Sequence, residues 1–446
     1  MNFTEQQILQ LAPDEASIKA GKNLSAASHW LVAAVNDRVL WGEIKGSGSK
    51  PYFTQIDLQN IAFKCSCPSR KFPCKHGLGL MLLSYTSPPA ILSGKEEPAW
   101  VADWMDKRVA KSVKSEPDQG TEQVVDEKGR EKRETDRLKS VEAGINELDL
   151  VLNDLVRHGL MHLNGLTNDF FSNLAKRMVD AKATGLANRI EGLNELKYSI
   201  SQKETQHRFV QQLAELNFIV RSFQNREQLD ELTLESLKVS MGWNQSSKSL
   251  VEDRRFETVK DHWLIAGQQL RERENMKIQT TYLVGKSTGK KAQLLQFSIN
   301  NQPMEWMLPI EAELEAGLVF FPHLIPFRAA IRVQNGTNAC DVSAYSGLQN
   351  FETALGEHAS NLQRFPLHFE TVVVVEGVKI GQVENRFVAI DSEQHYLRLD
   401  EEAFSVSKQI DWLAKTEGKA CKTILILRFN RVIPLGIFVS SNYYCL

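Results

Sequence analysis

The sequence contains no hydrophobic run long enough to cross a bilayer and no basic, apolar leader at its beginning. Its longest apolar runs, such as Val372 to Val375, have the length of a strand, whereas a membrane-spanning helix needs roughly 20 apolar residues. The opening residues MNFTEQQILQLAPDEA lack the basic region and the long apolar core of a secretory signal. We therefore expect a cytoplasmic protein that does not associate with membranes.

An excess of charge of either sign is also absent. The 53 Lys and Arg residues nearly balance the 55 Asp and Glu residues, and the formal net charge is −2. No global positive field therefore attracts nucleic acid, so any nucleic-acid surface has to be a local patch. The shares of hydrophobic residues, 42%, and of charged residues, 24%, are typical of a folded soluble protein.

Cysteine is too scarce for a disulfide framework, which belongs to small secreted proteins. Six cysteines occur in 446 residues, and three of them lie between positions 65 and 74. Cys340, Cys421 and Cys445 stand far apart with no histidine nearby, and we interpret them as structural. In a reducing compartment, thiols that cluster next to a histidine indicate a metal site.

The hydrophobic patterns predict a multi-domain α+β protein in which four parts follow one another. Residues 1–106 combine short helices with alternating strands, and residues 50–85 within them predict a small ββα-type module around the cysteine cluster. Residues 107–137 are dense in charge and poor in large apolar side chains, which predicts a charged linker that is either disordered or transiently helical. Helical periodicity across 138–250 predicts four or five antiparallel helices, and 251–446 predicts a mixed, mainly-β region of one or two domains.

Four metal-ligating residues lie within one short segment: Cys65, Cys67, Cys74 and His76. Two cysteines at i and i+2 on a strand point to the same face, which brings a first pair of sulfurs together. Prolines restrict the connecting loop, which delivers the second pair at the start of a helix. Four protein ligands close the shell of tetrahedral Zn2+ and leave no position for water or substrate, so the sequence predicts a structural zinc site. The alternative is that these are ordinary buried side chains without a metal.

The C-x-C…C-x-H pattern of these ligands resembles the SWIM zinc finger, including the apolar helix that follows His76. The wider run AFKCSCPSRKFPCKHGLGL, the sequence LWGE at 40–43 and the pair Trp100 and Trp104 resemble a group of bacterial SWIM proteins. Members of that group have a comparable N-terminal module, a charged linker and a long remainder. They are often encoded beside MoxR-type AAA+ ATPases and von Willebrand A domain proteins. The resemblance implies Zn2+ as the cofactor and the binding of DNA or protein as the function.

Basic residues and one aromatic residue surround the predicted ligands: Lys64, Arg70, Lys71, Phe72 and Lys75. Such side chains can contact phosphates and stack on a base, which is the nucleic-acid interpretation. The alternative is electrostatic, because three thiolates and one Zn2+ leave a negative charge that nearby cations offset. In that case the aromatic ring simply covers the metal.

The organisation of the chain favours a protein–protein interaction adaptor. A charged linker between a small zinc module and two larger bodies lets each part hold a partner. By the resemblance, the partner is a MoxR-type AAA+ ATPase or a von Willebrand A domain protein. DNA or RNA binding through the basic surface of the finger is the alternative, although acidic residues in both flanking segments interrupt a continuous basic face.

The motifs of common enzyme classes are incomplete, so we expect no catalytic activity and see no small-molecule substrate. GKSTGKK at 285–291 contains the G-K-S of a phosphate-binding loop, but Thr280 stands where the first glycine is required. DVSAY at 341–345 differs from the metal-binding motif of von Willebrand A domains, because a tyrosine replaces its second serine. His158 and His162 have the spacing of a helical metal pair, but a glycine breaks the H-E-x-x-H pattern.

Overall fold

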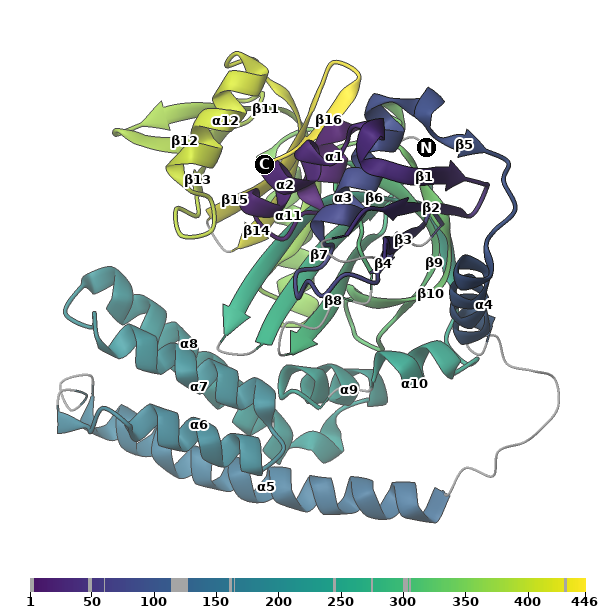
Figure 1. Ribbon diagram of the computed structural model, residues 1–446. Coiled ribbons are helices and arrows are strands. Elements are labelled where there is room, and N and C mark those ends of the chain that lie inside the picture. Colours follow the sequence, from purple (N-terminus) through teal and green to yellow (C-terminus); the bar gives the residue numbers. More distant parts are fainter. Residues whose placement is uncertain are drawn as a thin grey trace.

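The chain folds into three regions that follow one another along the sequence, as Figure 1 shows. The computed structural model describes residues 4–46, 50–59, 61–113, 127–159, 163, 165–243, 246–273, 276–299, 304, 306–428 and 431–446. A sheet module comes first, a helical region follows, and two β-rich sheets form the C-terminal part. The predicted mixed α+β class is confirmed. None of the described helices offers the apolar length that a bilayer crossing requires.

Five strands form the sheet of the N-terminal module: β1 (Trp30–Val35), β2 (Val39–Ile44), β3 (Tyr52–Asp57), β4 (Ala62–Cys65) and β5 (Leu92–Ser93). Their order in the sheet is β4-β3-β2-β1-β5. The first four strands form an antiparallel meander, and β5 pairs in parallel with the outer edge of β1. The sequence predicted this meander, because alternating apolar residues separated by turns are typical of neighbouring antiparallel strands.

Four helices accompany this sheet: α1 (Glu5–Gln10), α2 (Glu15–Asn23), α3 (Lys75–Thr86) and α4 (Ala99–Val113). The spacing of Leu78, Met81 and Leu82 predicts an amphipathic α3, whereas α3 is buried on all sides from His76 to Leu83. The sheet covers one side of α3, and α1 and α2 cover the other. Glycine permits this close packing, since a Cβ on Gly21 of α2 would lie 2.9 Å from the Leu78 Cβ.

The second face of the sheet carries α4, a helix that the spacing of Trp100 and Trp104 predicted. Both rings pack against a small core that α4 shares with β1 and β2. The guanidinium of Arg108 on α4 donates a 2.8 Å hydrogen bond to the buried carboxylate of Asp57, which ends β3. Packing and this ion pair together fix α4 on the module.

The segment predicted as a linker, 107–137, is partly helical. The end of α4 extends into this segment up to Val113, and α5 (Glu127–His158) begins within it. Residues 114–126 lie outside the described part of the chain. A high density of charge does not prevent helix formation, because Lys, Arg and Glu are good helix formers.

The helical region contains α5, α6 (Phe170–Asp180), α7 (Thr184–Lys197), α8 (Lys203–Gln224), α9 (Glu231–Ser240) and α10 (Ser247–Glu252). The apolar face predicted for α5 is buried in their common core: Val141, Ile145, Leu148, Leu152 and Leu155. The described residues of this region thus contain six helices, whereas we predicted four or five. The short α10 buries Leu250 alone, so its sequence has no apolar period to detect.

The first β-rich sheet is a closed barrel of β6 (Val259–Arg273), β7 (Met276–Gly285), β8 (Lys291–Ile299), β9 (Ala312–Phe320) and β10 (Arg328–Ala339). The segment GKSTGKK connects the two strands of a hairpin, because β7 and β8 pair in antiparallel on either side of it. The carboxylate of Asp261 accepts hydrogen bonds from the N–H groups of Ser287 and Thr288, at 3.0 and 2.8 Å. The N–H groups of this loop therefore bind a side chain of the protein.

The second sheet contains β11 (Thr371–Val383), β12 (Arg386–Ile390), β13 (Tyr396–Leu399), β14 (Cys421–Arg428), β15 (Arg431–Val439) and β16 (Asn442–Cys445). The helices α11 (Phe351–Arg364) and α12 (Val406–Thr416) pack on it. Leu264 and Tyr282 of the barrel share one apolar cluster with Val372, Ile424 and Leu435 of the sheet. The barrel and the sheet therefore pack directly on each other.

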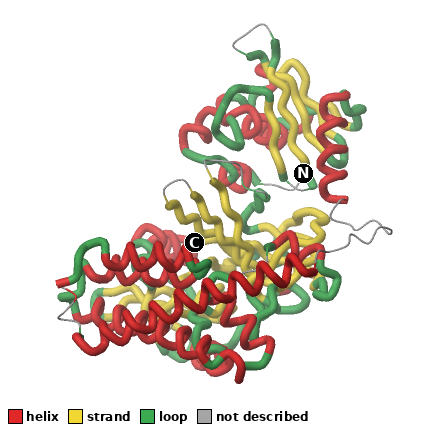
Figure 2. Tube along the Cα trace, turned by 90° about the horizontal axis from the view of Figure 1, so that it is seen from below, coloured by secondary structure: helices red, strands yellow, loops and turns green. Residues whose placement is uncertain are grey.

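The β-rich region lies between the N-terminal module and the helical region (Figure 1, Figure 2). On one side, the side-chain amide of Gln7 on α1 donates a 3.4 Å hydrogen bond to the carbonyl oxygen of Ile310. On the other side, Ile325, Phe365 and Leu367 enter the core of the helical region. Segments far apart in the sequence thus join the three regions.

Candidate metal centre

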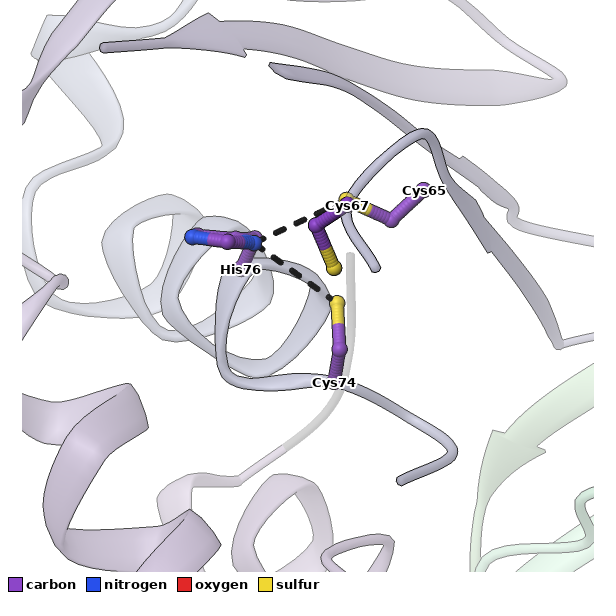
Figure 3. Close-up of side chains that lie close together, drawn as sticks. All are labelled: Cys65, Cys67, Cys74 and His76. Carbon is purple, nitrogen blue, oxygen red and sulfur yellow. Dashed lines mark hydrogen bonds between the residues drawn. The ribbon is translucent and has the colours of Figure 1, made fainter. Parts of the chain in front are cut away.

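Four side chains from β4, the following loop and the start of α3 point toward one another, as Figure 3 shows. Cys65 ends β4 and Cys67 follows two residues later, while Cys74 is the N-cap of α3 and His76 lies in its first turn. The ligand atoms of these residues all lie within 4.8 Å of one another. The structure therefore brings together the four predicted metal ligands.

The distances between these atoms fit a tetrahedral zinc ion. The Nδ1 atom of His76 lies 3.7 Å from the Sγ of Cys65 and 3.9 Å from the Sγ of Cys74. Zn–S bonds of about 2.3 Å and Zn–N bonds of about 2.0–2.1 Å at tetrahedral angles require ligand separations of about 3.5–3.8 Å. Three thiolates and an imidazole are the ligands of a closed structural site, in which Zn2+ would connect β4 to α3.

The pKa values of the thiols explain why a cation completes this cluster. Hydrogen bonds from Cys74, and then from His76 and Thr54, lower the pKa of Cys65 to about 4. The interaction with Cys65 raises the pKa of Cys74, and burial raises the pKa of Cys67. The cluster by itself therefore favours one thiolate, and a bound cation would supply the charge that lets all three sulfurs ionise.

The antiparallel pairing of β3 and β4 positions the first two ligands. Thr54 lies opposite Cys65, and its hydroxyl oxygen is 3.2 Å from the Cys65 Sγ. One residue further, the N–H of Ser66 donates to the carbonyl oxygen of Phe53, and the Ser66 hydroxyl accepts from the Phe53 N–H, both at 2.9 Å. These bonds hold the chain just past the end of β4, so the backbone reaches Cys67 in a defined direction.

The first turn of α3 positions the other two ligands. A thiolate at the N-cap, the position of Cys74, faces the N–H groups of that turn, which favour negative charge. The buried ring of His76 lies 5.2 Å from the ring of Tyr52. A Cβ on Gly77 would lie 2.7 Å from the ring of Phe63, so glycine at this position lets α3 approach β4.

The four basic residues predicted around the ligands are exposed: Lys64, Arg70, Lys71 and Lys75. One of them is engaged, because the ammonium of Lys71 lies 2.8 Å from the carboxylate of Asp14, the N-cap of α2. This hydrogen bond, with those from Ser17, lowers the pKa of Asp14 to about 2. Phe72 is half-buried and packs edge-on against Phe63, with ring centroids 6.3 Å apart. Sequence reasoning missed Asp14, which lies far from the finger along the chain.

A cavity of about 440 Å³ adjoins the cluster between α2, β3 and the loop that follows β4. Cys67 and His76 form part of its wall, together with the side chains of Lys45, Lys71 and Lys75. Sequence reasoning also missed Lys45, because it follows β2 and reaches the finger only through the order of strands in the sheet. Three cations beside the ligands make this cavity suited to an anionic group.

His158 and the remaining cysteines lie outside this cluster. His158 ends α5, and its exposed ring lies 2.9 Å from the carbonyl oxygen of Asp154, whereas His162 lies outside the described residues. Cys340, Cys421 and Cys445 are free thiols. Among the described residues, the His, Cys, Asp and Glu side chains that could share a metal ion are those of this cluster at β4 and α3.

Comparison with protein families defines the class of this site. Residues 52–85 match the SWIM zinc finger, and residues 136–241 match the SWIM-associated four-helix bundle domain. No curated protein and no solved structure matched the chain. The first match spans β3, β4, α3 and all four ligands, so this part of the chain is a zinc-binding domain of the SWIM type. A helical bundle of the kind associated with that finger follows it.

Proposed function

We propose that this protein is a non-enzymatic adaptor whose zinc-stabilised N-terminal module binds a protein partner. The chemistry of the metal site supports a structural role, since four protein ligands leave zinc no position for a substrate or a reactive water. The position of Phe72 argues against base stacking, because this ring packs on Phe63 within the module. The module therefore offers its other exposed surfaces for recognition.

The outer edge of β1 carries this proposal. Among the described residues, β5 pairs with β1 at Ala34 and Val35 alone, so the preceding part of β1 has no strand on that side. Leu31 on this part of β1 is 62% exposed, and Val32 and Leu92 beside it are exposed as well. The backbone N–H and C=O groups of an open strand edge form a template to which a strand of another protein can add, and the apolar side chains beside it can contact that strand.

The resemblance to bacterial SWIM proteins supports the choice of partner and compartment. MoxR-type AAA+ ATPases and von Willebrand A domain proteins are the partners that we propose to test, in a bacterial cytoplasm. The thiols of all six cysteines are free, which is compatible with a reducing compartment. The helical region and the β-rich region would then hold further partners beside the one at β1.

A pull-down with nuclease treatment tests the proposal. The full-length protein is used as bait for the purified MoxR-type and von Willebrand A candidates and for native cytosol. We expect a defined protein to be retained by the wild type and lost in Leu31→Lys, because a lysine at a strand edge opposes pairing. The matched control is Leu150→Lys on α5, whose leucine is 72% exposed in the wild type. Equal retention by both variants would exclude the β1 edge as the interface.

Nucleic-acid binding is the second candidate function, and the cavity lined by Lys45, Lys71 and Lys75 favours it. These cations could contact phosphate groups next to the finger. The charge reversal Lys45→Glu/Lys75→Glu removes two of these cations and leaves the four ligands and the β1 edge unchanged. If nucleic acid is retained by the wild type in the pull-down without nuclease and is lost in this variant, the finger binds nucleic acid and the adaptor proposal is wrong.

A further inference from the structure

A second cavity, of about 450 Å³, lies at the junction of the barrel and the C-terminal sheet, far from the metal centre in the sequence. One wall belongs to the barrel and carries Lys290 and Lys291 of the β7–β8 hairpin. The other wall belongs to α11 and to the segment that leads into β11 (Figure 1), and it carries Glu357, Asn361 and His368. Cations and a carboxylate therefore come from different walls.

Aromatic and aliphatic side chains line the rest of this cavity. Phe256, Phe320 and Phe327 contribute rings, and Ile325 and Val372 contribute branched side chains. A volume of several hundred Å³, an apolar lining and a few polar groups are the usual features of a small-molecule site. This cavity therefore suits a ligand with an aromatic or branched apolar body.

The charges around this cavity balance, which restricts the charge of the ligand. Glu370 lines the cavity but is already paired with Arg428. Among the described contacts, Glu257 and Glu357 have no ion-pair partner, and they line the same cavity as the two lysines of the hairpin. A net anion would meet two free carboxylates and a net cation would meet two ammonium groups. A ligand that carries one positive and one negative charge can pair with a carboxylate and with an ammonium group of the cavity at the same time.

Uncharged polar groups on the α11 side are held in position. The side-chain amide of Asn361 donates a 3.3 Å hydrogen bond to the hydroxyl of Thr371, which leaves its carbonyl oxygen to accept from a ligand. Burial lowers the pKa of His368 to about 4, so this imidazole is neutral at physiological pH. Behind the lining, the Nδ1 atom of His358 lies 2.9 Å from the same hydroxyl, so two side chains hold Thr371 in position.

We propose that this cavity binds a small zwitterion with an apolar or aromatic side chain, namely a free α-amino acid. The carboxylate of the ligand lies against Lys290 and Lys291, and its ammonium donates to Glu357 and to the Asn361 carbonyl oxygen. Its side chain lies among the phenylalanine rings. This site is independent of the zinc module and of the partner proposed for it.

Calorimetric titration of the full-length, zinc-loaded protein tests the ligand class. The probes are L-phenylalanine, L-tyrosine, L-leucine, L-isoleucine and L-methionine, together with phenethylamine and 3-phenylpropionate, which each lack one of the two charges. We expect one or more of the amino acids to bind with a stoichiometry of one, and both single-charge analogues of phenylalanine to bind at least roughly tenfold more weakly, because a charge-assisted hydrogen bond is lost. If none of the amino acids binds at millimolar concentration, or if the analogues bind equally well, the proposal is wrong.

Substitutions on the two walls locate the site. Glu357→Gln and Lys290→Gln/Lys291→Gln should each weaken amino-acid binding by roughly ten- to a hundredfold without changing the melting temperature. The matched controls are Glu352→Gln, also on α11, and Lys277→Gln on β7, neither of which lines the cavity. These should bind like the wild type. If the wall variants bind the amino acid with wild-type affinity, the ligand binds elsewhere and the assignment is wrong.

Discussion

Two sheet-based regions of this protein are held together in different ways. The N-terminal module closes around four metal ligands that lie within twelve consecutive residues. The barrel and the C-terminal sheet instead share an apolar cluster whose side chains come from strands far apart in the sequence. A metal would stabilise the first region in addition to its own apolar core, whereas the second region is stabilised by the packing of apolar side chains without a metal cluster among its described residues. The two regions should therefore respond to different perturbations.

The largest effect should follow the loss of zinc from the N-terminal module. The apparent binding free energy of structural zinc is on the order of 10 kcal/mol in small zinc domains. In Cys67→Ala we expect the metal to be lost and hydrogen exchange to become fast in β3, β4 and α3. The strands of the barrel and of the C-terminal sheet should keep their protection. Zinc content and exchange followed by mass spectrometry measure both outcomes.

Cys340→Ala is the matched control for this substitution, because Cys340 is a free thiol of the β-rich region outside the metal cluster. It should keep one zinc ion and wild-type exchange in the N-terminal module. A Cys67→Ala protein that retains its metal and its exchange pattern would remove the distinction between the two regions.

A core substitution in the barrel should have the next largest effect and leave the metal in place. Trp263 is fully buried, and its indole N–H donates a 3.1 Å hydrogen bond to the carbonyl oxygen of Ala316. Trp263→Ala should lower the free energy of unfolding by about 3–5 kcal/mol, as is typical when a large aromatic side chain is removed from a core. Urea unfolding measures this change, and zinc content should be unaltered.

Leu270→Ala serves as the control on the same strand, since Leu270 is 56% exposed. Its effect should stay within about 0.5 kcal/mol, as expected for a surface substitution. If Trp263→Ala releases zinc, the two regions unfold together and are not stabilised independently.

The pH dependence of stability should reveal a smaller contribution from the β-rich region. The pKa of His368 is about 4 in the folded chain, below the ordinary value of 6.5 that applies when the chain is unfolded. Between these values the unfolded chain binds a proton that the folded chain excludes, so stability falls as the pH decreases from about 6.5 to 4. The loss is at most roughly 3 kcal/mol.

His368→Gln should reduce the slope of unfolding free energy against pH in this window, while the exposed residue His207 provides the control His207→Gln. Acid also competes for the zinc ligands, but that contribution is common to all three proteins and cancels in the comparison. An unchanged slope in His368→Gln would show that the burial of this imidazole is not linked to folding.

The smallest effect should come from the ion pair between Asp14 and Lys71 at the surface of the N-terminal module. Asp14→Asn removes the charge but keeps a side chain that caps helices well, so the start of α2 is preserved. Exposed ion pairs contribute little to stability. We expect zinc content and melting temperature to match the wild type, whereas Asp14→Ala should lower the melting temperature through loss of the cap. A clear destabilisation by Asp14→Asn would mean that this ion pair, in addition to the packing of α2 on α3, holds the finger to α2.

The same contrast between the regions explains how much the sequence could predict. Cys65, Cys67, Cys74 and His76 were predictable because the spacing of ligands within one strand, loop and helix already implies their convergence. The complete burial of α3 was not predictable. A helical period of apolar residues indicates one buried face, and it contains no information about α1 and α2, which cover the other face. The mixed α+β class followed from the change of period along the chain.

Features that depend on contacts between segments far apart in the sequence could not be predicted. Lys45 and Asp14 reach the finger through the order of strands and the packing of α2. The cavity beside α11 takes its lining from positions 256–372, where no short motif links Lys291 to Glu357. A single sequence without such a motif does not reveal that a barrel and a sheet place these side chains opposite each other.

X-ray absorption at the zinc edge of the purified full-length protein tests the central claim most directly. We expect one zinc ion per chain with three sulfur ligands at about 2.3 Å and one nitrogen ligand at about 2.0–2.1 Å, unchanged by the addition of small ligands. A shell in which oxygen replaces one of these ligands would be an open site, and it would contradict a purely structural role for Cys65, Cys67, Cys74 and His76.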